Sequence, residues 1–312
     1  MNAAPLKIGN TVLKNNVLLA PLAGYTNYPF RRLCARYGAG LTFTEMVSAK
    51  GLEYGSENTA ALLYTTDEES PKAAQIFGRD ARAMRLACEH PALAPFPIVD
   101  INMGCPVPKI YKNGEGSALL NEPESAEQIV KECVKSGKTI TVKFRIGVTK
   151  DKLVTRDFAR RMEDAGASMI TVHGRTRDAF YAGEVNWKEI ASAKSAVKIP
   201  VVANGGIFGR EDGERLLSET GADGIMIARA ALFNPQIFCE FTGATGENKS
   251  EMIRRQLRET KEILGEKFAT VYMRKMVGFY LKGTRGAAEI KARLFACPST
   301  NEVLKIVDEL EW

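Results

Sequence analysis

Cysteines are scarce in this sequence, and none of them is closely paired. The six are Cys34, Cys88, Cys105, Cys133, Cys239 and Cys297. The absence of any C-x-x-C pair argues against a structural zinc site. A chain of 312 residues with so few cysteines is typical of a reducing compartment, in which thiols stay free. We therefore expect a cytoplasmic protein with no disulfide and no bound metal.

Long apolar runs are also missing. No run approaches the roughly 20 residues that a membrane-spanning helix needs. The opening segment, MNAAPLKIGNTVLKNN, lacks the apolar region of a secretory signal. Hydrophobic residues make up 45% of the chain and charged residues 26%, as in an ordinary globular protein. We expect no association with a membrane.

Acidic residues are few in one part of the chain. Residues 249–305 contain 13 Lys or Arg against 6 Glu, a local excess of +7 in a chain whose net charge is +6. Such a run fits the solvated face of a helix. It equally fits a surface that binds a polyanion such as RNA. Charge alone leaves both interpretations open.

What the sequence does contain is a regular alternation of short apolar runs with longer segments of helical period. Near-continuous apolar runs bounded by turn residues are typical of parallel strands that are buried on both faces. Eight strand-then-helix units over about 240 residues predict a (β/α)8 TIM barrel, an α/β fold, over residues 1–243. The predicted strands are residues 17–24, 41–49, 72–78, 97–105, 140–147, 168–176, 199–207 and 223–232.

The predicted helices between these strands have recognisable ends. Pro123 lies in the first turn of one, which Gly137 ends. Segments 156–165 and 210–220 have helical period and are each followed by glycine.

The composition changes at TGATGENKS, residues 242–250, after which no strand-like run follows. Apolar residues at helical spacing predict helices over 253–264 and 268–281. Ser299 and Glu302 form a capping box ahead of a third. We expect residues 244–312 to form a small all-helical domain attached to the barrel.

Polar side chains and glycines gather at the ends of the predicted strands, where barrel enzymes place their active sites. Taken singly, each fits a structural role, such as capping a loop or pairing with a carboxylate. Together they predict a flavin mononucleotide (FMN) site. Glycine turns after strands seven and eight suit a phosphate, a lysine stabilises an anionic ring, and amides suit a polar ring. The residues are Gln75, Asn102, Cys105, Lys143, Arg145, His173, Arg175, Asn204, Gly205, Gly206, Ala228 and Arg229. No G-x-G-x-x-G follows a strand, which argues against a tightly held dinucleotide.

Seven motifs in register make the chain resemble the tRNA-dihydrouridine synthases, and in particular their bacterial B-type branch. They are APLAGYTNYPFR (20–31), QIFG (75–78), DINMGCPVPKI (100–110), VKFRIG (142–147), HGRTR (173–177), NGGI (204–207) and RAALFNP (229–235). RKMVGFYLKG (274–283) resembles the signature of the family's helical domain. The resemblance implies an FMN-dependent, NADPH-consuming oxidoreductase that reduces the C5–C6 bond of a uridine in RNA, most simply in the D-loop of a tRNA.

The resemblance also assigns roles to residues. It implies that Cys105 is the catalytic acid and that Asn102 faces the uracil. The implied flavin contacts are Pro21, Leu22, Ala23, Gln75, Lys143, His173, Asn204, Gly205, Gly206, Ala228 and Arg229. Besides Asn102, we expect RNA contacts from Lys109, Lys112, Arg145, Arg175, Arg177, Arg274 and Lys275.

Four positions depart from the family pattern. Gly206 replaces an acidic residue and Ala228 a glycine, and both leave backbone donors available for a phosphate. Met276 and Phe279 stand where histidine and tryptophan are common. Because they belong to the domain expected to face RNA, we expect them to bear on the choice of substrate.

The chemistry requires a hydride at C6 of the uracil, supplied by the reduced flavin, and a proton at C5. A thiol, with its ordinary pKa near 8.5, is protonated at neutral pH and can release that proton. The base must leave the RNA stack to reach the barrel mouth. We expect the protein to act as a monomer.

Four alternatives stay open. The RNA could be ribosomal, or the substrate could be a free pyrimidine on an FMN barrel. Lys143 could be the Schiff-base lysine of an aldolase. The chain could also be a non-catalytic RNA-binding barrel.

Overall fold

Eight parallel strands form the barrel that the sequence predicts. The computed structural model describes residues 4–310 and 312, so the outermost residues of the two expected domains, 1–3 and 311, lie outside the described residues. The strand order is β3-β12-β11-β10-β7-β6-β5-β4, and a parallel bridge between Leu18 and Leu41 closes the barrel. Each expected strand is present but shorter than expected: β3 (Val17–Leu19), β4 (Thr42–Ser48), β5 (Lys72–Phe77), β6 (Ile98–Met103), β7 (Thr139–Arg145), β10 (Met169–His173), β11 (Val201–Asn204) and β12 (Gly224–Ile227).

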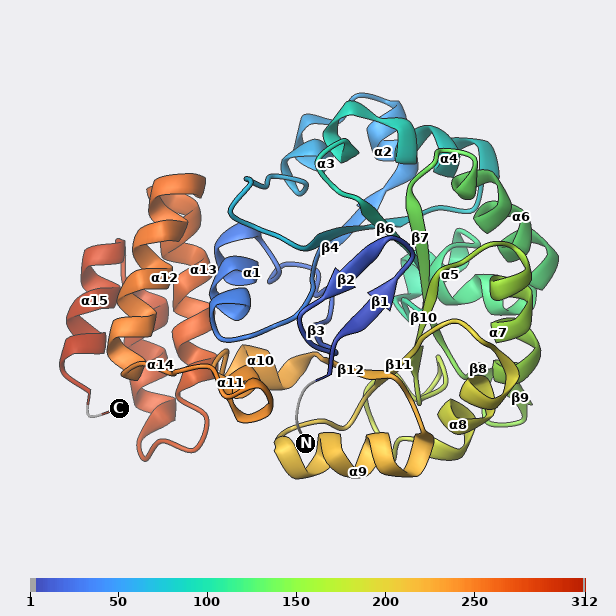
Figure 1. Cartoon of the computed structure of the whole chain (residues 1–312). Coiled ribbons are helices and arrows are strands. Elements are labelled where there is room, and N and C mark those ends of the chain that lie inside the picture. The colour runs from blue at the N-terminus through green and yellow to red at the C-terminus, as the bar shows by residue number, and fades with distance from the viewer. Residues whose placement is uncertain (1–3, 311) are drawn as a thin grey trace.

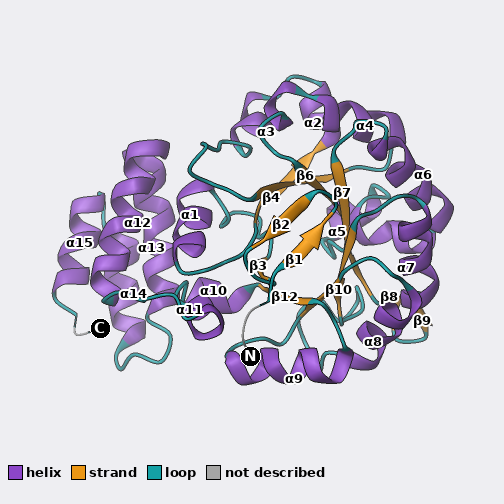
Figure 2. Ribbon diagram, in the orientation of Figure 1, coloured by secondary structure: helices purple, strands orange, loops and turns teal. Residues whose placement is uncertain are grey.

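Helices surround the strands on the outside (Figure 2). Local signals account for their ends: Pro123 opens α6, and Gly221 ends α9 with a φ of 66° in the left-handed region. The helices of this layer are α1 (Tyr28–Arg36), α2 (Ala49–Glu53), α3 (Glu57–Ala61), α4 (Ala81–Glu89), α5 (Pro108–Lys112), α6 (Pro123–Val134), α7 (Thr155–Asp164), α8 (Trp187–Ala196), α9 (Arg210–Thr220), α10 (Arg229–Phe233) and α11 (Ile237–Thr242), with short 3₁₀ turns at Pro91–Leu93 and Gly116–Asn121.

Two small hairpins were not expected from the sequence. Strands β1 (Leu6–Ile8) and β2 (Thr11–Leu13) lie across the barrel in Figure 1. Their apolar side chains pack with the first residues of the barrel strands and so close the amino-terminal end. Because β1 and β2 cover the amino-terminal end, the pocket must open at the carboxyl end. Strands β8 (Gly147–Thr149) and β9 (Lys152–Leu153) form the other hairpin.

Alternation along the strands decides which side chains face the barrel interior. On β6, Val99 and Ile101 pack outward in the core between sheet and helices, whereas Ile98 packs inside the barrel. Asp100 and Asn102 follow Ile98 at every second position and are buried inside. The interior is thus apolar at the bottom and polar toward the carboxyl end. Neighbouring strands bring the polar residues Gln75, Lys143, His173 and Asn204 to this end.

The carboxyl-terminal residues form four helices beside α1, α10 and α11 (Figure 1). They are α12 (Lys249–Leu264), α13 (Glu266–Tyr280), α14 (Ala287–Ala296) and α15 (Thr300–Asp308), of which α14 was not expected. One apolar core runs from the barrel into these helices, and the Tyr272 hydroxyl donates to the Tyr25 carbonyl at 2.8 Å. Gly243, with a φ of 72°, ends α11 next to the expected boundary between residues 243 and 244. Across the described residues, no helix has both the length and the apolar character to cross a membrane.

Candidate active site

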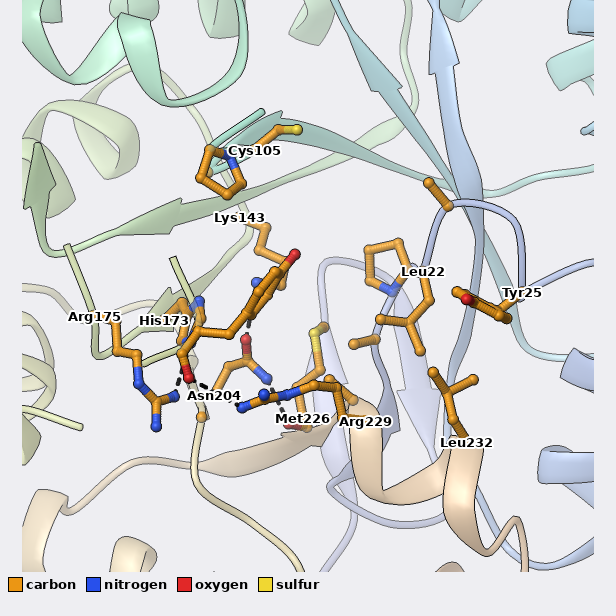
Figure 3. A pocket seen from close by; sticks show the side chains of 18 of the residues that line it. Leu22, Tyr25, Cys105, Lys143, His173, Arg175, Asn204, Met226, Arg229 and Leu232 are labelled. Carbon is orange, nitrogen blue, oxygen red and sulfur yellow. Dashed lines mark hydrogen bonds between the residues drawn. The ribbon is translucent and has the colours of Figure 1, made fainter. Parts of the chain in front are cut away.

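A cavity of about 530 Å³ opens at the carboxyl ends of the barrel strands. This volume lies in the range of about 300–1,000 Å³ that is usual for cofactor and ligand pockets. Figure 3 shows Cys105, Lys143, His173, Arg229 and Leu22 placed around one space. The structure brings together here every residue expected to contact the flavin, together with Asn102, Cys105, Arg145 and Arg175.

Cys105 follows β6 in a tightly held loop. Its carbonyl accepts a hydrogen bond from the Ser117 hydroxyl at 2.7 Å. Gly116, with a φ of 60°, passes so close that an added Cβ would lie 3.0 Å from the Cβ of Cys105. Cys105 is only 9% exposed, and burial raises its pKa above the ordinary value. It is therefore a thiol at neutral pH.

Three buried side chains form a chain of hydrogen bonds below this loop. Asp100 accepts from the Gln75 amide at 2.7 Å, and Gln75 accepts from the Asn102 amide at 2.8 Å. The Asn102 oxygen accepts from the backbone N–H of Cys105 at 2.9 Å and of Gly104 at 3.1 Å. We did not expect Asp100 to be part of the site, although it opens the motif DINMGCPVPKI, because it lies within a predicted buried strand. Burial raises its pKa to about 6.

Lys143 lies at the floor of the pocket, next to this chain. Its Nζ donates to the Asn204 side-chain oxygen at 3.0 Å, and Asn204 donates to the Met226 carbonyl at 2.7 Å (Figure 3). Burial and the charge of Arg145 lower the pKa of Lys143 to about 8. A largely protonated amine with one polar partner suits the anionic edge of a ring.

Arg145 joins two loops at the pocket wall. Its Nε donates to the Gly104 carbonyl at 2.9 Å, and its Nη1 donates to the carbonyls of Thr176 and Phe180. Burial lowers its pKa to about 10, so it stays charged. The contact with the substrate that we expected from Arg145 stays a prediction, since its Nε and Nη1 already serve the protein.

The turn after β11 leaves room for an anion. Gly205 has a φ of 116°, and a Cβ there would lie 2.9 Å from the His173 ring. Burial and four surrounding cations lower the pKa of His173 well below its ordinary value, so the ring is neutral. The cations are Lys143, Arg145, Arg175 and Arg229. Several positive charges beside a glycine turn fit the phosphate of FMN.

Aromatic residues line part of the pocket, among them Tyr25, Tyr181, Phe208 and Phe279, and we did not expect them as a group from the sequence. Phe279 of α13 lines the pocket and packs edge-on against Tyr25, with ring centroids 5.6 Å apart. Tyr181 is 52% exposed and Phe208 49%. The Arg229 guanidinium lies 5.2 Å from the Tyr181 ring and 5.9 Å from the Phe208 ring. The sequence held one indication of these rings, since Tyr181 and Phe208 follow shortly after the motifs HGRTR and NGGI.

Met276 and Phe279, which we expected to bear on the choice of substrate, lie in different surroundings. Met276 is fully buried in the apolar core, so its side chain has no surface to offer an RNA. Phe279, one helical turn away, forms part of the pocket wall. Met276 thus packs in the core that α13 shares with the barrel, whereas Phe279 reaches the pocket from the same helix.

The remaining residues expected to contact RNA lie outside the pocket lining. Lys109 and Lys112 are exposed on α5, and the Arg177 guanidinium stacks 4.2 Å from the Tyr111 ring. The Lys275 ammonium lies 5.7 Å from the Tyr25 ring, at the rim. Arg274 donates instead to the Cys297 carbonyl, within the helical region.

The basic excess of the helical region is smaller in three dimensions than in the sequence. Arg254 pairs with Asp308, Arg255 with Glu247 and Arg293 with Glu309. All three carboxylates lie just outside the window of residues 249–305. Three of the thirteen cations in that window are therefore paired with carboxylates that the charge count leaves out.

Comparisons with known proteins bear on this site. Residues 18–311 match the family model described as dihydrouridine synthase. The chain is 38% identical to a probable tRNA-dihydrouridine synthase 1 of a Synechocystis species, over 98% of this chain and 89% of that one. It is 37% identical to tRNA-dihydrouridine synthase B of Vibrio parahaemolyticus, over 92% of each chain.

Solved structures share the barrel at low identity. An old yellow enzyme homologue from Zymomonas mobilis superposes with a TM-score of 0.55 at 14% identity, over 74% of this chain and 89% of that one. Histamine dehydrogenase from a Rhizobium species superposes with a TM-score of 0.58 at 13% identity, over 88% of this chain and 50% of that one. These likenesses support the fold.

Proposed function

The chain belongs to the dihydrouridine synthase family, and we propose from this membership and from its pocket that it reduces the C5–C6 bond of a uridine in tRNA. The observation that carries the proposal is the convergence of a buried thiol, a buried lysine and a glycine turn on one cavity. The cofactor is FMN and the reductant NADPH. We propose that the protein acts in the cytoplasm, as a monomer.

The residues that line the cavity fit FMN. Lys143 would hold the anionic edge of the ring, and the backbone of Pro21, Leu22 and Ala23 would support its plane. The turn of Gly205 and Gly206 would hold the phosphate, together with Ala228 and Arg229. Asn204 holds the Lys143 ammonium in place, because it is itself anchored to the Met226 carbonyl.

Bound and reduced FMN supplies the hydride that C6 accepts. The chain's own part is to supply the proton at C5, and we propose the Cys105 thiol as its source. Burial keeps this sulfur protonated, and the Ser117 contact holds the loop that carries it. After transfer, the thiolate lies near Arg145 and Lys143, whose charges favour it. Solvent can then return the proton.

The pocket opening suits a nucleotide that has left its helix. A uridine must be unstacked to reach the floor of the cavity. Exposed aromatic rings with cations near them, such as Tyr181 and Phe208 with Arg229, are suited to neighbouring unstacked bases. Lys109, Lys112 and Arg177 would contact the RNA backbone.

The substitution Cys105→Ala tests the assignment of the acid. Flavin binding and its reduction by NADPH should continue, while formation of dihydrouridine in tRNA should fall by at least about 100-fold, as expected when a general acid is lost. Nucleoside mass spectrometry of tRNA incubated with the protein measures the product. Cys239 is half-buried and lies outside the pocket lining, so Cys239→Ala is the matched control and should keep full activity.

Full activity of Cys105→Ala would remove Cys105 from the mechanism. Nucleoside mass spectrometry of tRNA and of ribosomal RNA from a deletion strain separates the two RNA classes. Loss of dihydrouridine from ribosomal RNA alone would overturn the tRNA assignment.

A further inference from the structure

Asp100 is a buried carboxylate that the proton transfer and the flavin contacts leave without a role. It is fully buried at the middle level of the barrel interior. Gln75, Asp100 and Thr141 stand at the same level on three adjacent strands, since Asp100 is in register with Gln75 on β5 and with Thr141 on β7. One carboxylate oxygen accepts from the Gln75 amide at 2.7 Å, and the other accepts from the Thr141 hydroxyl at 2.6 Å.

In the chain of hydrogen bonds from Asp100 to the Cys105 loop, each group accepts from the next one toward the loop. Gln75 donates to Asp100 and accepts from Asn102, and Asn102 in turn accepts from the backbone N–H groups of Gly104 and Cys105. A carboxylate can only accept, and a backbone N–H can only donate. Both ends of the chain therefore require the same orientation of the two amides between them.

The consequence for the loop is specific. If the Gln75 amide turned over, its NH2 group would face the NH2 group of Asn102. Asn102 would then have to turn as well, and its NH2 group would face the N–H of Cys105. The loop would lose the acceptor that holds it, and two buried donors would meet. An acceptor at position 100 prevents this.

We infer that Asp100 is a positioning residue, which acts through Gln75 and Asn102 to fix the backbone that carries the Cys105 thiol. This inference rests on the proposed function, in which Cys105 delivers a proton. Asp100 touches neither the thiol nor the substrate. Asp100 acts by supplying an acceptor oxygen to the Gln75 amide, and its negative charge is not required for this role.

Two substitutions separate the acceptor from the charge. Asp100→Leu removes both and leaves the orientation of Gln75 unfixed. Asp100→Asn removes the charge but keeps an oxygen for the Gln75 amide, because its NH2 group can face the Thr141 hydroxyl, which accepts as well as donates. If Asp100→Leu does not fold, Asp100→Ala makes the same comparison.

Hydrogen exchange of the backbone N–H groups of Gly104 and Cys105, in the flavin-free protein, reads the loop directly. We expect exchange at least about tenfold faster in Asp100→Leu and unchanged within about twofold in Asp100→Asn, since the protecting acceptor is lost only in the first. In the flavin-loaded protein, single-turnover reduction of uridine should slow by about ten- to a hundredfold in Asp100→Leu. Flavin reduction by NADPH is measured beside it and should slow less than uridine reduction, because it does not use the thiol, although Gln75 also lines the flavin pocket.

Equal losses in both variants would assign the role to the charge of Asp100 and overturn the inference. Normal exchange and normal uridine reduction in Asp100→Leu would overturn it as well. The exchange experiment needs neither FMN nor RNA. Failure of the wild type to make dihydrouridine would thus contradict the proposed function without being confused with failure of the Asp100 chain.

Discussion

At the scale of single residues, the barrel interior holds two ionisable groups whose charged forms are disfavoured by burial. Lys143 and Asp100 lie in the same interior, and burial lowers the pKa of the lysine to about 8 while it raises that of the carboxyl to about 6. Such opposed shifts are typical of functional sites, where stability is given up for chemistry. A cationic lysine without a full counter-charge is suited to a ligand that brings negative charge.

The lysine predicts a pH-dependent stability of the flavin-free protein. Its folded pKa lies below its ordinary value of 10.5, so between about pH 8 and 10.5 the unfolded chain holds more protons than the folded chain. Stability due to this group must therefore rise with pH in that window, and the unfavourable contribution is fully present below about pH 8. In Lys143→Met this dependence is absent.

We expect the melting temperature of Lys143→Met, relative to the wild type, to be highest near pH 7 and to decline toward pH 9.5. Thermal unfolding of both proteins at matched pH values measures the difference. A difference that stays constant with pH would contradict the lowered pKa. Lys138→Met offers a comparison outside the pocket: Lys138 donates to two backbone carbonyls, and burial lowers its pKa as well, so its difference should decline with pH in the same direction.

At the scale of elements, a buried ion pair ties the first helix to the strands beside it. Arg31 on α1 and Glu69, which precedes β5, meet through two hydrogen bonds of 2.5 and 2.8 Å, and both side chains are buried. Glu69 also accepts from Thr42 of β4 at 2.9 Å. Burial alone would raise the pKa of Glu69, but hydrogen bonding and charge from Arg31 outweigh it and lower the pKa. The Arg31 Nη1 also donates to the Thr26 carbonyl at 2.9 Å, so the pair is tied to the loop that contributes Pro21 to Ala23.

Removing one partner should be costly, because it leaves a buried charge alone. We expect Arg31→Met to lower the free energy of unfolding at pH 7 by about 3–5 kcal/mol, and Arg31→Met/Glu69→Leu to recover part of that loss. Urea unfolding measures both. As the pH falls from 7 to 4, the unpaired Glu69 of the single variant takes up a proton whereas the paired one does not. The gap to the wild type should therefore narrow, and a gap that widens would contradict the lowered pKa of Glu69.

At the scale of the whole molecule, the helical region and the barrel share one apolar core. Met273, Met276 and Val277 of α13 are buried in the same cluster as Phe30 and Leu33 of α1. Phe279, from the same helix, lines the pocket. The region that we expected to serve as an attached RNA-binding domain thus also completes the wall of the active site.

Residues 1–243 alone should therefore not behave as an independent barrel. Removal of residues 244–312 exposes a large apolar face on α1 and α10, so we expect aggregation and loss of flavin binding. Size-exclusion chromatography and flavin absorbance measure the two effects. Tyr272→Phe, which removes the hydroxyl that donates to the Tyr25 carbonyl but keeps the apolar ring, is the control and should cost about 1 kcal/mol with folding retained. A monomeric, flavin-binding fragment would show instead that residues 1–243 are a separable domain.

The sequence by itself determined the eight strands, the order in which the motifs follow one another, and the residues at the strand ends, including Cys105. These are local properties, because apolar period and turn residues act over a few positions. Only the tertiary structure decided what those residues touch: that Asp100 directs Gln75, that Arg145 holds two loops, and that Phe279 joins the pocket. The reason is physical, since such partners lie on different strands or helices, tens of residues apart in the chain, and barrel closure alone sets their distances. The β1–β2 hairpin escaped prediction for the complementary reason that three-residue strands carry almost no periodic signal, and its place is set by the open end of the barrel that it covers.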